Sequence, residues 1–180
     1  MAASTFRRLV VVGFMFGLFG WHPAAQDADP VIGTWVLSVA KSHFSSGPAP
    51  QSETRTLVME GQQTKLTAKN VNEPRTYLTV RQEIKATSIG VDGDGKLRTG
   101  EWTVVYDGKD RAITGDPDAD VLSTRRIDPF LSEFTKKRAG QAVITGTCAI
   151  SRDGRTMTIA SKGINARGQM IDDVAVFEKQ

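Results

Sequence analysis

Three aspartates at alternate positions, Asp116, Asp118 and Asp120, come closest to a metal-binding pattern in this sequence. Their spacing matches the first ligands of an EF-hand calcium loop. Such a loop also needs glycine at its sixth position and glutamate at its twelfth, where this chain has Val121 and Ile127. Aspartate is also common in turns, because its carboxylate accepts hydrogen bonds from nearby backbone N–H groups. We therefore expect a turn here and no bound metal.

Nucleophilic catalysis has few candidate residues. Beyond the N-terminal segment the chain has one histidine, His43, and its single cysteine is Cys148. A catalytic triad needs a base that is oriented by a carboxylate, and zinc needs three or four ligands. Cys148 alternates in phase with Ile144 and Ile150, which predicts a buried, inert thiol. The sequence therefore predicts a protein that is not an enzyme and uses no cofactor.

Two charged residues, Arg126 and Asp173, share a strand face with residues expected to point inward. Arg126 alternates with Leu122 and Thr124, and Asp173 alternates with Ala175. A buried ion needs a partner, and the polar group of a ligand would supply one. An internal salt bridge, or a place at the water-exposed end of a strand, would explain the same charges.

The elements that must position these residues are β-strands. Alternating apolar and polar segments recur about every ten residues between turn residues, which is typical of a β-sandwich or β-barrel. We expect about ten or eleven strands, with separate strands at 51–60 and 64–71, the first ended by Gly61. Val39 is expected on the same face of the first strand as Trp35. At most one helical turn is expected, near residues 40–44.

Short connections make sequential strands antiparallel neighbours, and a long meander loses its exposed edges best by closing on itself. The predicted fold is therefore an all-β, antiparallel up-and-down meander, closed into a β-barrel of about 8–11 strands. An open two-sheet sandwich is the alternative. A membrane-spanning barrel would need an outward apolar band, whereas Thr, Arg, Glu and Lys occupy the outward positions here.

The first 25 residues have the pattern of a secretory signal. Arg7 and Arg8 precede an uncharged apolar run over 9–21, which is shorter than the roughly 20 apolar residues of a membrane-spanning helix. We expect cleavage after Ala25, although an uncleaved anchor is the alternative. One domain then covers 26–180, with no stable membrane insertion. It is expected to be exported, either periplasmic or secreted. Removing two arginines lowers the net charge of +3 to about +1, so the charge indicates no nucleic-acid partner.

Both ends of this domain resemble the calycin superfamily, which includes lipocalins and fatty-acid-binding proteins. Gly33-Thr34-Trp35 is similar to the Gly-x-Trp of its first strand, and Val176-Phe177-Glu178-Lys179 is similar to a last strand. The segments 106–110 and 115–120 further resemble a group of bacterial exported lipocalin-like proteins of uncharacterised function. This resemblance implies a lipocalin-like barrel. Ala175 and Phe177 stand where fatty-acid-binding proteins hold a ligand carboxylate with Arg and Tyr, so the same binding mode is not implied.

The residues expected inside the barrel are mostly large and apolar. The leading hypothesis is a cavity that binds or carries a small hydrophobic molecule. A barrel filled by its own side chains, acting as a structural or interaction protein, is the alternative. The sequence leaves the oligomeric state open. The candidate ligand-binding residues are Trp35, Leu78, Trp102, Tyr106, Arg126, Asp173 and Phe177.

Overall fold

The structure is a computed structural model that describes residues 29–68 and 75–180. Side chains of residues 62–82 are not described, and the expected signal at 1–25 lies outside the described residues. The elements in chain order are β1 (Gly33–Leu37), the short 3₁₀ helix η1 (Val39–Lys41), β2 (Ser52–Ala68), β3 (Arg75–Val91), β4 (Leu97–Val104), β5 (Arg111–Ala112), β6 (Val121–Asp128), β7 (Leu131–Arg138), β8 (Gln141–Ile150), β9 (Thr156–Ile164) and β10 (Met170–Lys179).

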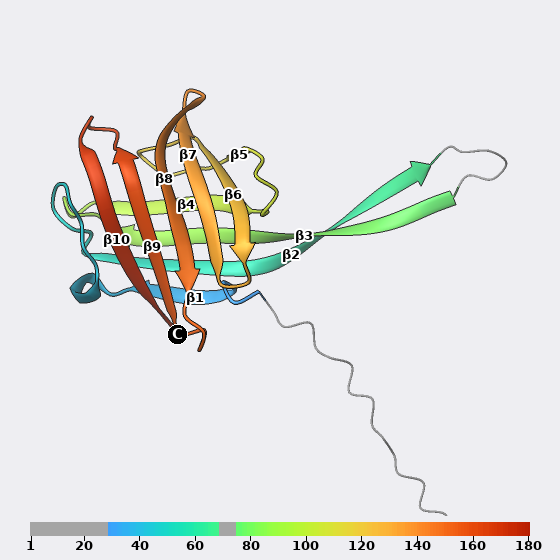
Figure 1. Cartoon of the computed structure of the whole chain (residues 1–180), viewed down its shortest axis with the longest axis horizontal. Helices are drawn as coiled ribbons and strands as arrows, with labels where there is room; N and C mark the ends of the chain where they lie inside the picture. Colours follow the sequence, from blue (N-terminus) through green and yellow to red (C-terminus); the bar gives the residue numbers. More distant parts are fainter. Residues whose placement is uncertain (1–28, 69–74) are drawn as a thin grey trace, which may run out of the picture.

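Ten antiparallel strands form one sheet, in the order β4-β3-β2-β1-β10-β9-β8-β7-β6-β5. Consecutive strands therefore lie side by side, except β4 and β5 at the two ends of the order, and β1 pairs with β10. Figure 1 shows β2, β3 and β4 crossing behind β6–β10, so that the sheet curls into a barrel. The predicted all-β meander is confirmed, and the barrel is nearly closed.

The seam of the barrel lies between β4 and β5. Glu101 and Thr114 exchange two backbone hydrogen bonds there, with N–O distances of 3.0 and 3.2 Å. Gly115 follows at a φ of +74°, and a Cβ atom at this position would lie 1.7 Å from the carbonyl oxygen of Thr99. Only glycine fits both the backbone angle and the close approach, so Gly115 allows the two edges to meet.

Two details of the predicted strands are wrong. The segments 51–60 and 64–71 were expected as two strands, but β2 continues through Gly61 and pairs with β3 along its whole length. Figure 1 shows this hairpin running past the barrel. Glycine weakens a strand without necessarily ending it. Val39 was expected beside Trp35 but lies in η1 with 38% of its surface exposed.

The apolar core is centred on Trp35, which is fully buried. Its indole Nε1 donates a hydrogen bond of 2.8 Å to the carbonyl oxygen of Val31, so the polar atom of the ring is satisfied. Gly33 has a φ of +138°, and the side chain of Lys179 occupies the space where a Cβ atom on residue 33 would lie. The other members of this core are Val31, Leu37, Leu57, Ile84, Ala86, Val104, Ile150, Met157 and Phe177.

Candidate functional site

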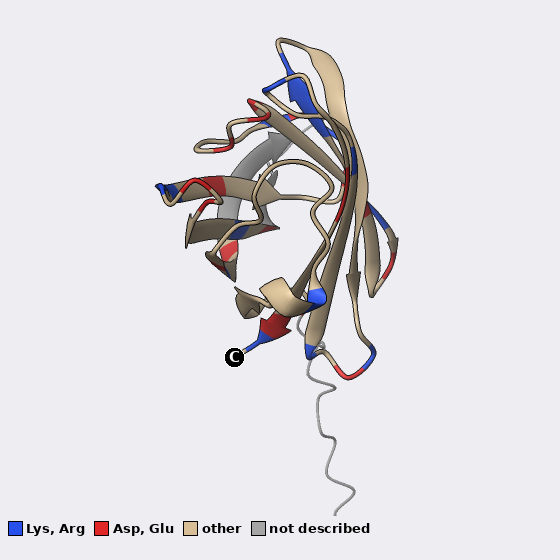
Figure 2. Ribbon diagram, turned by 90° about the vertical axis from the view of Figure 1, so that its left-hand side faces the viewer, with Lys and Arg blue, Asp and Glu red and all other residues tan. Residues whose placement is uncertain are grey.

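The interior of the barrel holds a cavity of about 550 Å³. Four loops surround its opening, which we call the open end: 46–50, 92–95, 115–118 and 165–169. Figure 2 views the molecule from this side, and many of its acidic and basic residues lie on turns and strand ends. The opposite end, where 29–31 and 129–130 lie, is called the closed end. A cavity of this volume is within the range of small-molecule sites in proteins, about 300–1,000 Å³.

Two predicted site residues, Trp102 and Tyr106, line the cavity, as does Cys148. Burial is the main cause that raises the pKa of Tyr106, so its hydroxyl stays protonated at neutral pH. Burial also raises the pKa of the Cys148 thiol, to about 11. A thiol with this pKa is a poor nucleophile, because the thiolate is the reactive form. These residues therefore provide an aromatic and weakly polar wall.

Arg55 is a charged cavity residue that the sequence interpretation missed. Its Nε donates a 2.7 Å hydrogen bond to Oε1 of Glu53. Its guanidinium carbon lies 4.6 Å from the ring centroid of Phe177 and 5.6 Å from that of Trp102. Arg55 is two residues from the buried Leu57 on the same strand, so strand alternation alone would have placed it inside.

Trp35 and Phe177 were also predicted to contact a ligand. Both are fully buried, and neither is among the residues that line the cavity. They belong to the core that closes the barrel. Leu78 lies on β3, in the part whose side chains are not described.

Arg126 lies at the closed end and is not among the residues that line the main cavity. Its guanidinium pairs with the carboxylate of Asp29 and lies 3.7 Å from the ring centroid of Tyr106. The internal salt bridge considered from the sequence is therefore present. Asp29 lies 97 positions earlier in the chain, so this pair ties the segment before β1 to β6.

Asp173 lines the cavity near the open end. Its Oδ1 accepts hydrogen bonds of 2.7 Å from both the backbone N–H and the hydroxyl of Ser45. The hydroxyl of Ser45 also accepts a bond from the backbone N–H of Asp172. His43 exchanges backbone hydrogen bonds with Val174. These polar residues thus hold the segment after η1 against β10.

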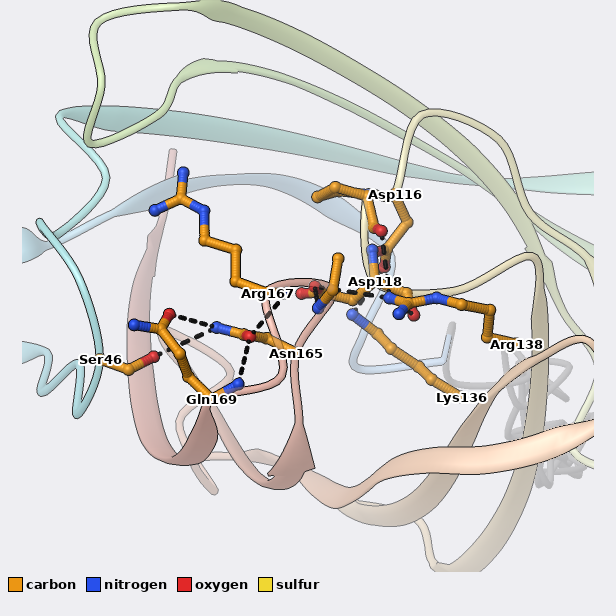
Figure 3. A network of polar contacts seen from close by, with 10 residues as sticks. Ser46, Asp116, Asp118, Lys136, Arg138, Asn165, Arg167 and Gln169 are labelled. Carbon is orange, nitrogen blue, oxygen red and sulfur yellow. Dashed lines mark hydrogen bonds and ion pairs between the residues drawn. The ribbon is translucent and has the colours of Figure 1, made fainter.

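Polar contacts join the loops at the open end, as Figure 3 shows. The Asp118 carboxylate accepts a 2.7 Å hydrogen bond from the backbone N–H of Ala166. Arg167 makes a 2.6 Å ion pair with Asp94, and the side chain of Asn165 contacts the Ser46 hydroxyl at 3.4 Å. The turn 165–168 therefore contacts the other three loops of the opening.

The aspartates at 116, 118 and 120 serve as turn and bridging residues. Asp116 accepts a 2.8 Å bond from the backbone N–H of Asp118 and pairs with Lys136 at 2.7 Å. Asp120 accepts a bond from the backbone N–H of Ala139. Among the side chains that the structure describes, no cluster of three or more metal-ligating groups is present.

A scan against protein-family models and a search of curated proteins found no match to this chain. Within the described part of the chain, no helix has the length and apolar character needed to cross a membrane.

Proposed function

We propose that this barrel binds a small, mainly apolar molecule in its central cavity. The cavity volume of about 550 Å³ carries the proposal, since a barrel filled by its own side chains would leave no such space. Its walls combine apolar side chains with a few polar groups, as ligand sites usually do. The hydroxyl of Tyr106 and the guanidinium of Arg55 would orient the ligand.

Access for the ligand would be from the open end. The loops there contact one another through exposed side chains, whose ion pairs contribute little free energy, typically about 0–1 kcal/mol. The closed end is filled by the fully buried Trp35 and Phe177. A molecule would therefore enter between the loops and come to rest against Trp102.

Native mass spectrometry of the purified chain, with and without added Nile red, tests this proposal. Nile red is a neutral, apolar dye whose emission rises when it leaves water. We expect one dye molecule per chain and an increase in its emission. A chain that shows neither dye binding nor a co-purifying small molecule would contradict the proposal and favour the filled or structural barrel.

We further propose that the protein is exported and lipocalin-like. The support is the signal pattern in 1–25 and the resemblance at Gly33-Thr34-Trp35, which opens β1. N-terminal sequencing of the protein recovered from its native cells is expected to begin at Gln26. Recovery from the cytoplasm with residues 1–25 intact would contradict export.

A further inference from the structure

The two terminal nitrogens of Arg55, Nη1 and Nη2, indicate which chemical group the cavity can hold. Its Nε is bonded to Glu53, and the rings of Phe177 and Trp102 lie near its guanidinium. The two terminal nitrogens have no hydrogen-bond partner among the described residues. The Arg55 side chain lines the cavity and is 23% exposed. An arginine side chain has donors and no acceptor, so a ligand group at these nitrogens must accept hydrogen bonds.

The charge of the cavity wall opposes an anionic ligand. Among the described residues, four cationic side chains and six carboxylates line the cavity, which gives a net charge of −2. The carboxylates are Glu53, Asp92, Asp94, Asp116, Asp118 and Asp173.

Each of the four lining cations already has a carboxylate partner. Arg55 pairs with Glu53, and the other three pairs are Arg98–Asp92 at 2.8 Å, Lys136–Asp116 at 2.7 Å and Arg167–Asp94 at 2.6 Å. A ligand carboxylate at Arg55 would therefore meet a neutralised guanidinium with the Glu53 carboxylate beside it, and like charges repel. A ligand ammonium at the same nitrogens would face only donors.

We propose that the cavity selects a neutral apolar molecule with a hydrogen-bond acceptor, such as an ester or ketone oxygen, held by Nη1 and Nη2 of Arg55. It discriminates against the carboxylate with the same carbon skeleton. This inference rests on the proposed function and names the ligand class of that site.

Displacement of Nile red from the full chain by methyl decanoate, decanoate and decylamine at about pH 7.5 tests the inference, because the acid and the amine are then charged. We expect the ester to bind about tenfold or more tightly than either charged competitor, a difference of one polar contact to a charged group. Equal or tighter binding of decanoate or decylamine would overturn the inference and leave the proposed function standing. If neither Nile red nor any competitor binds, both fail.

Two variants test whether the Arg55–Glu53 ion pair causes the preference for the ester over the charged competitors. Glu53→Gln keeps the side-chain size and removes the negative charge, so the affinity for decanoate should rise about tenfold while that for the ester changes little. Arg55→Met keeps the apolar stem and removes the donors, so the ester should lose its advantage.

The matched control is Lys41→Met, because Lys41 pairs with Glu178 and does not line the cavity. This variant should match the unmodified chain. If Arg55→Met lowers the affinity for all three competitors equally, or if Glu53→Gln leaves the ester-to-acid ratio unchanged, Arg55 does not select the ligand. Glu53→Gln alone decides the question if the Arg55 variant does not fold.

Discussion

The closed end and the open end of this barrel are built from different interactions. At the closed end, Trp35 and Phe177 are fully buried, and burial of each such side chain contributes about 1.5–3 kcal/mol. At the open end, four loops meet through exposed charged and polar side chains such as those of Arg167 and Asp94. The stability of the fold therefore depends on one end, while the other can separate at little cost in free energy. This division fits the proposal that a ligand enters the cavity without unfolding of the barrel.

The largest expected effect is at the closed end. Trp35→Ala should lower the free energy of unfolding by about 3–5 kcal/mol, because it leaves a cavity in the core and removes the bond to the Val31 carbonyl. Urea denaturation measures this loss. The matched control is Val39→Ala, an exposed apolar residue nearby in sequence, which should change stability by about 0.5 kcal/mol or less. Similar losses in the free energy of unfolding for both variants would contradict the conclusion that Trp35 stabilises the closed end.

The reactivity of the Cys148 thiol measures how well the cavity wall is shielded from reagents in solvent. Because burial raises its pKa to about 11, its thiolate fraction near pH 8 should be about a hundredfold below that of an ordinary cysteine. The rate of reaction with a disulfide reagent should therefore be low and rise about tenfold per pH unit up to pH 10. Bound Nile red should slow it further. Labelling at pH 8 as fast as for a small-molecule thiol would contradict this description.

Filling the cavity should remove binding and keep the fold. Ala175 lines the cavity, so Ala175→Trp places a large ring in the space proposed for the ligand. We expect affinity for Nile red to fall about tenfold or more, with a loss of stability of about 1–3 kcal/mol from overpacking. Ala142→Trp, at an exposed position on β8, is the control. Unchanged dye binding in a folded Ala175→Trp variant would place the dye elsewhere.

The smallest effect is expected at the open end. The side chains of Arg167 and Asp94 are 58% and 40% exposed, so Arg167→Ala should lower the free energy of unfolding by about 1 kcal/mol or less. Urea denaturation of this variant beside Trp35→Ala tests the comparison directly. A loss at the open end as large as that at the closed end would mean that the loops are part of the stable core.

The sequence predicted the architecture well, because strand alternation and turn residues are local signals. The strand expected at 121–128 matches β6, and the loop predicted at Asp116–Asp120 lies between β5 and β6. The interior charges were harder to predict. Arg55 shares a face with Leu57, yet its contacts with Trp102 and Phe177 come from strands distant in sequence. Such contacts depend on closure of the barrel, which no local pattern specifies.

The contacts of Arg126 and Tyr106 were hard to predict for the same reason, because they join segments that are distant in sequence. Alternation placed both inside, but the partner of Arg126 is Asp29, in a segment before β1. An ion pair between residues so far apart in sequence can be identified only when the positions of the first and sixth strands in the barrel are known. Conversely, Trp35 was predicted to contact a ligand, whereas its full burial in the core separates it from the cavity wall.

The most direct test of a ligand cavity above a closed core uses the two tryptophans as separate reporters. In a Trp21→Phe background, Trp102 alone remains in Trp35→Phe, and Trp35 alone remains in Trp102→Phe. Adding Nile red should quench the emission of Trp102, which lines the cavity, markedly more than that of the fully buried Trp35. Quenching confined to Trp35, or absent from both variants, would contradict the account.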